Sequence, residues 1–198
     1  HMVIGIRKDL YGDVKLELPK APENLVVPTV GQAIMDLASY EVGYNKEFEE
    51  VLYTGEEVLS DYAKQMREGS VSVKNHITTQ TTKTALERFK QIQPGKNFHS
   101  LSKKMKSTYS KPERTQNTIY LRLEPDAPSG TVVNVRKSMW IHPTLDRAVT
   151  VREAARLQSF PDSFEFVGTK DSQFQQVGNA VPPLLAKGIA EKILEYME

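Results

Sequence analysis

The stretch TVREAARLQSFPD, residues 150–162, predicts a short helix whose two ends are marked in the sequence. Thr150 and Glu153 form the capping-box pattern, in which each side chain bonds the other residue's backbone N–H. Pro161 has no backbone donor, and it breaks the helix. At helical spacing, one face collects Val151, Ala154, Ala155 and Gln158. The stretch is therefore an amphipathic helix of a folded domain.

Two arginines, Arg152 and Arg156, lie four residues apart on another face of this helix. They are equally suited to pairing with carboxylates inside the protein and to contacting phosphate groups. We favour the structural role.

Further along, residues 176–183 read QVGNAVPP. Glycine permits backbone conformations that other residues avoid, and asparagine tolerates them while offering donors and acceptors. Proline suits the first turn of a helix, so a helix is expected from Leu184 onward. We interpret Gly178 and Asn179 as a tight polar turn at the start of this helix.

The composition is that of an ordinary folded protein, with 198 residues, 39% hydrophobic and 26% charged. This length allows one domain, or one domain plus an appendage. No apolar run suits a membrane helix and no signal peptide is visible, while His1-Met2 reads as a scar of recombinant expression. The chain has no cysteine and four scattered histidines, so we expect a cytoplasmic protein with no disulfide and no metal site.

The net charge of +1 conceals a basic segment between residues 74 and 122. This segment holds eleven basic and two acidic residues, a net charge of +9, whereas residues 3–62 hold twelve acidic and five basic ones. A concentrated cationic segment is typical of a protein that binds a polyanion. The alternative, a solvated lysine-rich surface, is equally consistent with the charge alone.

The N-terminal half predicts short elements. Residues 3–7 and 14–18 read as strands, and 19–28 form a proline-rich connector. A capping box at Thr29 and Gln32 predicts a helix through Leu37. A second one, at Thr54 and Glu57, predicts a helix through about Arg67 that ends at Gly69.

The basic segment is less regular. Residues 84–92 read as a helix, and the lysine-rich stretch 100–111 reads as a loop. Residues 118–123 and 131–135 are rich in β-branched side chains and are separated by a turn, so we expect two paired strands.

Three blocks resemble the cytosine-5 DNA methyltransferase family. Residues 147–162, RAVTVREAARLQSFPD, are similar to the ninth motif of that family, and residues 176–183 are similar to its tenth and last motif. They occur in the family's order and at short separation. Residues 3–8, VIGIRK, resemble the end of the eighth motif. The resemblance therefore brackets the chain from end to end and implies that a target-recognition domain lies between these blocks.

The resemblance also implies what this stretch does not contain. In the family, a cysteine in a Pro-Cys loop attacks C6 of the target base, a glutamate assists at N3, and a glycine-rich turn holds most of S-adenosylmethionine. This chain has no cysteine and no such turn. Because covalent addition of a thiolate activates C5 of the base, we expect no methyl transfer by this chain alone. The resemblance identifies it as the C-terminal part of a methyltransferase of a restriction-modification system, which implies a place in the bacterial cytoplasm.

The resemblance further implies a fold and a division of the chain. We expect an α+β fold: a small target-recognition domain with short helices and a few antiparallel strands, plus a C-terminal helix that docks on a missing α/β, Rossmann-like catalytic domain. Residues 1–20 would be a remnant of catalytic-domain strands, 21–146 the DNA-binding domain, and 147–198 the segment of the last two motifs. The implied partners are double-stranded DNA and the N-terminal catalytic part, in the same chain or in a separate subunit.

The candidate site residues fall into two groups. The resemblance places Asn179 and Ala180 near the amino-acid end of S-adenosylmethionine and Val181 behind the cysteine loop, and it gives Thr131 a backbone-positioning contact near a cytosine swung out of the duplex. Thr131 could also be a plain strand residue. The remaining DNA-binding candidates, chosen for charge and polarity, are Lys103, Lys104, Lys106, Tyr109, Lys111, Arg114 and Arg122.

Two other readings remain open. The chain could be a stand-alone DNA-binding or regulatory module descended from such an enzyme, without catalysis. It could also be a fragment that binds nothing tightly by itself, which salt-dependent binding to duplex DNA would exclude.

Overall fold

The structure is a computed structural model that describes residues 5, 7–12, 17, 19–21, 23–44, 50–133 and 135–196. Most of its elements are short helices. In chain order the elements are α1 (Lys8–Tyr11), α2 (Val30–Ile34), η1 (Met35–Leu37), β1 (Val51–Leu52), α3 (Asp61–Arg67), β2 (Ser72–Val73), α4 (Lys83–Phe89), η2 (Phe98–Ser100), α5 (Lys103–Lys106), η3 (Pro112–Arg114), α6 (Val135–Ser138), α7 (Val151–Leu157), α8 (Lys170–Asn179) and α9 (Pro183–Leu194).

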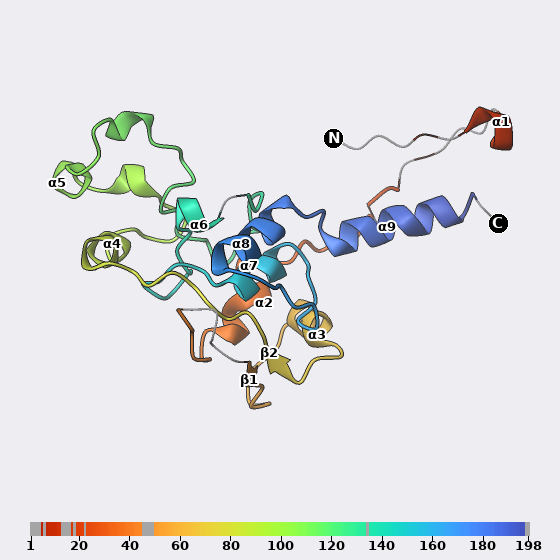
Figure 1. Cartoon of the computed structure of the whole chain (residues 1–198), viewed down its shortest axis with the longest axis horizontal. Helices are drawn as coiled ribbons and strands as arrows, with labels where there is room; N and C mark the ends of the chain where they lie inside the picture. The colour runs from red at the N-terminus through yellow and green to blue at the C-terminus, as the bar shows by residue number, and fades with distance from the viewer. Residues whose placement is uncertain are drawn as a thin grey trace.

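Helix α7 lies at the centre of the main body. It packs against α2 on one side and α8 on another, and α2 also packs against α3; Figure 1 shows these helices gathered in the middle of the molecule. The apolar face predicted for this helix is buried: the side chains of Val151, Ala154 and Ala155 are fully inaccessible to solvent. Together with Trp140 and Phe174, these side chains belong to the largest hydrophobic cluster among the residues that the structure describes.

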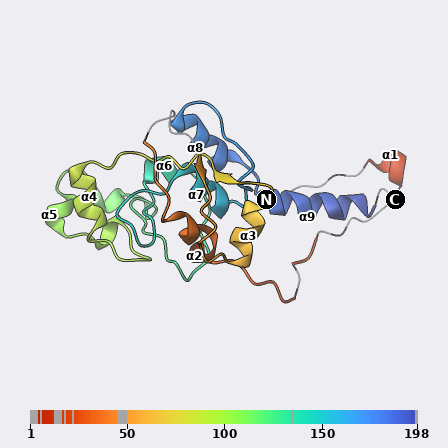
Figure 2. The same cartoon turned by 90° about the horizontal axis from the view of Figure 1, so that it is seen from below.

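A second, separate cluster builds a distal lobe, which we define as residues 83–121. Its centre is formed by Phe89, Phe98 and Tyr120, whose rings contact one another edge-on or tilted. Helices α4 and α5 lie together at one end of the molecule in both views (Figures 1 and 2). The core of the lobe also includes Ile141 of the main body, and backbone hydrogen bonds from Tyr120 and Leu121 to Ser138 and Ile141 join the two units.

Helix α9 extends from the main body at the end opposite the distal lobe (Figures 1 and 2). Pro183 occupies its first turn, as the sequence predicted, and none of the residues 183–194 is buried. Its exposed apolar side chains include Leu184 and Leu185. Near its end, the Tyr196 hydroxyl accepts a hydrogen bond of 3.0 Å from the Glu17 backbone. No helix among the described residues is long and apolar enough to cross a membrane.

Two of the three predicted capping boxes are confirmed. Thr29 with Gln32 opens α2, and Thr150 with Glu153 opens α7, each with both reciprocal hydrogen bonds present. The third, at Thr54, is wrong: the Thr54 hydroxyl bonds the Glu57 carboxylate, and α3 begins only at Asp61, where the Ser60 side chain accepts from the Ala63 backbone. Spacing alone does not distinguish a cap from a turn that happens to carry the same two residues.

The predicted pair of strands at 118–123 and 131–135 is wrong. Residues 117–120 form turns, and Val135 begins helix α6. Tyr120 has φ of 51°, in the left-handed region, which an extended strand does not allow. Of that segment, Arg122 alone makes a bridge, to Ile141. Within the described residues the sheet is two-stranded and antiparallel, with Val51 opposite Val73 and Leu52 opposite Ser72.

Two smaller expectations also change. The stretch 100–111 contains the one-turn helix α5, capped by Ser102. Gly178 and Asn179 are the last turn of α8, not a turn before a helix, and Val181 with Pro182 links α8 to α9. The strands predicted at 3–7 and 14–18 lie mostly outside the described residues. The helix predicted at 84–92 is confirmed as α4.

Candidate functional site

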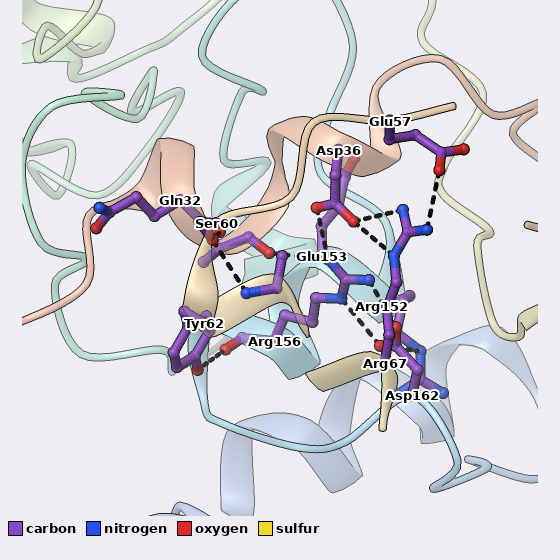
Figure 3. A network of polar contacts seen from close by, with 12 residues as sticks. Gln32, Asp36, Glu57, Ser60, Tyr62, Arg67, Arg152, Glu153, Arg156 and Asp162 are labelled. Atoms are coloured by element: carbon purple, nitrogen blue, oxygen red, sulfur yellow. Dashed lines mark hydrogen bonds and ion pairs between the residues drawn. The ribbon is translucent and has the colours of Figure 1, made fainter. Parts of the chain in front are cut away.

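Arg156 is the centre of a buried polar network beneath α7 (Figure 3). Its guanidinium donates to both oxygens of Asp162, at 2.9 and 2.6 Å, and to Asp36 at 2.6 Å. Its fourth bond, of 3.1 Å, goes to the Ala33 carbonyl at the end of α2. Burial alone lowers the pKa of this guanidinium, but the two carboxylates outweigh burial and raise it. Arg156 therefore remains charged and joins α2, α7 and the loop after α7.

Arg67 extends this network to α3. It donates to Asp36 at 3.0 and 2.6 Å and to Glu57 at 3.1 Å, and its guanidinium stacks 3.9 Å from the centre of the Tyr53 ring. The Tyr53 hydroxyl in turn bonds the Asp162 carboxylate. Burial, and then the charge of Asp162, raises the pKa of Tyr53, so the phenol stays protonated.

Arg152 holds the loop that follows α7. Its guanidinium donates to the carbonyls of Lys74, Pro161 and Phe164 at 2.9, 2.9 and 2.5 Å, and its side chain is fully buried. The structural role favoured for Arg152 is confirmed, as it is for Arg156, because neither guanidinium reaches the surface.

Glu153 forms a second buried centre, in the first turn of α7. Arg147 donates to its two oxygens at 2.8 and 2.6 Å, and the Thr150 backbone donates at 2.8 Å. Burial by itself raises the pKa of Glu153, but the charge and hydrogen bonds of Arg147 outweigh it and bring the pKa to about 2. Burial lowers the pKa of both neighbouring histidines, His76 and His142, to about 4.

The three residues predicted to border the methyl donor lie together where α8 gives way to α9. Asn179 ends α8 with its side chain exposed, Ala180 is half-buried, and Val181 is 60% exposed. Beside Asn179 lies an open pocket of about 380 Å³ between α6 and α8, lined among others by Val133, Arg136 and Gln175. Asn179 and its neighbours thus place an amide and an apolar side chain at the surface. This arrangement could form one side of a ligand site, but it does not enclose a ligand.

The predicted DNA-binding residues divide between two places. Lys103, Lys104, Lys111 and Arg114 are exposed on the distal lobe. Lys106 is half-buried and donates to the His99 carbonyl at 2.7 Å. Thr131 is exposed on the main body.

Tyr109 also belongs to the distal lobe, but its ring serves the fold. It is half-buried and packs 4.4 Å from the Phe98 ring, centre to centre. Burial raises the pKa of its hydroxyl to about 12.

The prediction that Arg122 contacts DNA is wrong. Its side chain is buried, and its N–H groups bond Ile92, Phe89, His142, Leu145 and Asp146 at 2.6 to 3.1 Å. Ile92 and Phe89 belong to the distal lobe, whereas the other three belong to the main body. Arg122 therefore joins the two units and has no donor left for a phosphate.

Arg88, counted in the basic segment, is likewise buried, and it bonds the Met105 carbonyl at 2.9 Å and the Thr108 hydroxyl at 2.6 Å. The charge count therefore overstates the cations available at the surface. Conversely, the count stopped before Arg136 and Lys137, which follow closely after Thr131 and lie at the pocket beside Asn179. A basic pair directly after the Thr131 segment was the signal that could have identified them.

Comparisons with known proteins agree with the motifs. The profile of the C-5 cytosine-specific DNA methylase family matches residues 2–195. The chain therefore belongs to the C-5 cytosine-specific DNA methylase family.

Among curated relatives, the chain is 35% identical over 182 residues to the type II methyltransferase M.DdeI of Desulfomicrobium norvegicum, a match that covers 84% of this chain and 43% of that protein. It is 39% identical over 139 residues to the type II methyltransferase M.AquIB of a Picosynechococcus species, covering 65% of this chain and 92% of that protein. The chain thus spans less than half the length of M.DdeI, whereas the match to M.AquIB covers nearly all of that relative.

A solved structure of an Escherichia coli protein, described as a DNA modification methyltransferase encoded within a prophage, has a similar fold. The TM-score is 0.66 at 21% identity, and the match covers 98% of this chain and 51% of that one. At this identity the likeness supports the fold alone. The mixed fold of short helices and short strands is thus similar to that of a DNA methyltransferase.

Proposed function

We propose that this chain is the DNA-recognition and cofactor-completing part of a DNA (cytosine-5-)-methyltransferase. The complete enzyme would transfer a methyl group from S-adenosylmethionine to C5 of a cytosine in a specific duplex sequence. The observation that carries the proposal is the contact between the Thr131 segment and the end of α8. This contact brings the proposed DNA contact close to residues 179–181, which we call the cofactor edge.

The distal lobe supports the DNA-binding half of the proposal. Lys103, Lys104, Lys111 and Arg114 are exposed on this lobe, and lysines and arginines that neutralise phosphates supply most of the affinity for a duplex. Because Arg122 fixes this lobe to the main body, its cations keep a set position relative to Thr131. Contacts held at a fixed spacing set the register and orientation of a protein on the duplex.

The end of α8 supports the cofactor half. Asn179 offers a donor and an acceptor at an exposed helix end, beside the apolar Val181. These residues would border the amino-acid end of S-adenosylmethionine, which supplies the methyl group when bound. The rest of that pocket, and the cysteine that attacks the base, would come from the catalytic part of the enzyme, because these 198 residues contain no cysteine. We propose that the catalytic part is either the same polypeptide or a separate subunit.

The test is reconstitution. This chain is combined with a cysteine-bearing catalytic part from the same source, and transfer of labelled methyl groups from S-adenosylmethionine to duplex DNA is measured. The pair should label cytosine at C5, and each part alone should not. Labelling by this chain alone would contradict its role as a part. Tight, salt-dependent DNA binding without any labelling by the pair would favour the stand-alone DNA-binding module instead.

A further inference from the structure

The side chain of Gln158, at the end of α7, touches both halves of the proposed site. Its Nε2 donates to the Val177 carbonyl in α8 at 2.5 Å and to the Val132 carbonyl at 3.4 Å. Val132 follows Thr131, and Val177 lies two residues before Asn179. One amide nitrogen therefore connects the backbone next to the proposed DNA contact with the backbone next to the proposed cofactor edge.

Two further contacts bring the same segments together. A Cβ on Gly178 would lie 3.0 Å from the Val133 carbonyl oxygen, so the absence of a side chain allows the two backbones to approach this closely. Arg136 in α6 forms an ion pair with Asp171 in α8, with 2.5 Å between Nε and Oδ1. The segment that follows Thr131 is thus held against α8 along its length.

The next residue, Ser159, holds the other side of the cofactor edge. Its hydroxyl accepts a hydrogen bond of 3.1 Å from the Leu184 backbone in the first turn of α9. Gln158 and Ser159 therefore form hydrogen bonds to the backbone before and after residues 179–181, at Val177 and at Leu184 respectively. Gln158 and Ser159 are themselves buried, each 8% exposed, at the end of the fully packed helix α7.

We infer that Gln158 is a positioning residue that couples DNA binding at Thr131 to the conformation of the cofactor edge at Asn179. The inference rests on the proposed function. When DNA fixes Thr131, the Val132 carbonyl is fixed with it, and the Gln158 amide transmits this constraint to Val177 and the end of α8. The reverse also holds, because coupling between two binding sites is reciprocal. Arg152 and Arg156 anchor α7 to the loop that follows it, close to Gln158.

Hydrogen exchange of this chain tests the inference without the catalytic part. The probe is a duplex selected from a randomised pool by its binding to the chain. In the wild-type chain, the duplex should slow amide exchange in two regions, at 131–133 and at 177–184. In Gln158→Met, which keeps the side-chain length but cannot donate, protection at 131–133 should remain. Protection at 177–184 should fall by about fivefold or more, the lower range of measured couplings between sites.

Gln65→Met is the matched control, because Gln65 is an exposed glutamine in another helix, α3. It should retain protection in both regions. A purely structural role for Gln158 would change the stability of the chain, measured by urea unfolding, but would not separate the responses of the two regions to DNA. The inference would be overturned if DNA slowed exchange at 177–184 equally in the wild-type chain and in Gln158→Met, or slowed it in neither. Either result would leave the proposed function intact. Absence of protection at 131–133 would contradict the proposed role of Thr131 and the inference with it.

Gly178→Ala provides an independent variant should Gln158→Met not fold. The added methyl group would meet the Val133 carbonyl and push the two backbones apart. It should likewise reduce the protection that DNA confers on 177–184 while preserving that at 131–133. Full transmission in a folded Gly178→Ala chain would count against the inference.

Discussion

Arg156 and Asp162 form an ion pair with two hydrogen bonds, of 2.9 and 2.6 Å, and both side chains are completely buried. The pair joins α7 to the loop that follows it, while the third carboxylate bond, to Asp36, reaches η1. The charges of Arg156 and Asp162 are fully paired only when Arg156, Asp162 and Asp36 are all present. The arginines of the ninth motif thus build the platform on which the DNA and cofactor surfaces are proposed to rest.

Asp162→Asn should destabilise the chain by about 3–5 kcal/mol, because it removes one charge of a buried pair and leaves Arg156 incompletely paired. The measurement is urea unfolding followed by circular dichroism. Asp61→Asn is the control, since Asp61 pairs with Lys64 on the surface, where such a pair is worth at most about 1 kcal/mol. Equal losses in the two variants would contradict the importance of burial.

The two similar sequence patterns at Thr150 and Thr54 should respond differently to alanine. Thr150→Ala removes the cap of α7 and should cost about 1–2 kcal/mol of unfolding free energy, whereas Thr54→Ala should cost about 0.5 kcal/mol or less, because Thr54 caps no helix. Both are measured by urea unfolding at the same pH. A loss at Thr54 as large as that at Thr150 would show that the turn at 54–57 carries more stability than its exposed hydrogen bonds indicate.

The features that could be predicted from sequence are those set by nearby residues. The caps of α2 and α7 depend on residues three apart, and the start of α9 depends on Pro183 itself. The structural role of Arg156 was favoured correctly, although its partner Asp36 lies far away in the chain. Local patterns predicted these elements because their hydrogen bonds close within one turn of chain.

The features that could not be predicted depend on distant partners or on unusual backbone conformations. Nothing near Arg122 in the sequence indicates that its acceptors lie at 89, 92, 142, 145 and 146. Tyr120 has a positive φ, which interrupts a segment whose composition favours a strand. The link through Gln158 was likewise not visible, since it joins residues 132 and 177 from separate parts of the chain.

The stability of the chain should fall as the pH is lowered from about 6.5 to 4. Burial lowers the pKa of His76 and His142 from 6.5 to about 4 in the folded chain, so across this range the unfolded chain binds more protons than the folded one. The stabilising effect is fully present above pH 6.5 and is lost as the pH falls through 4. In addition, the Nδ1 of His142 accepts from the backbones of Thr144 and Leu145, each at 3.2 Å, and protonation there would break both bonds.

Urea unfolding at a series of pH values measures this effect. His142→Gln should flatten the dependence between pH 6.5 and 4, even if it lowers stability at pH 7. His99→Gln is the control, because His99 lies half-buried in the distal lobe, away from Glu153. A wild-type dependence that survives unchanged in His142→Gln would place the titrating group elsewhere.

Arg114 and Arg122 should separate DNA binding from folding. Arg114 is exposed on the distal lobe, so Arg114→Gln should leave the unfolding free energy within about 0.5 kcal/mol. If Arg114 contacts a phosphate, the slope of log K for duplex DNA against log salt should fall by about 1. Arg122→Gln should instead destabilise the chain by about 3 kcal/mol, because buried carbonyls at the joint between lobe and body lose their donors.

The two readouts together decide between the roles. Fluorescence anisotropy of a labelled duplex over a range of salt concentrations gives the slope, and urea unfolding gives the stability of the same preparations. For Arg122→Gln, the salt slope should stay near the wild-type value in whatever fraction of the chain is folded, since no phosphate contact is lost. A reduced slope in Arg122→Gln with unchanged stability would return Arg122 to the DNA surface, and an unchanged slope in Arg114→Gln would remove Arg114 from it.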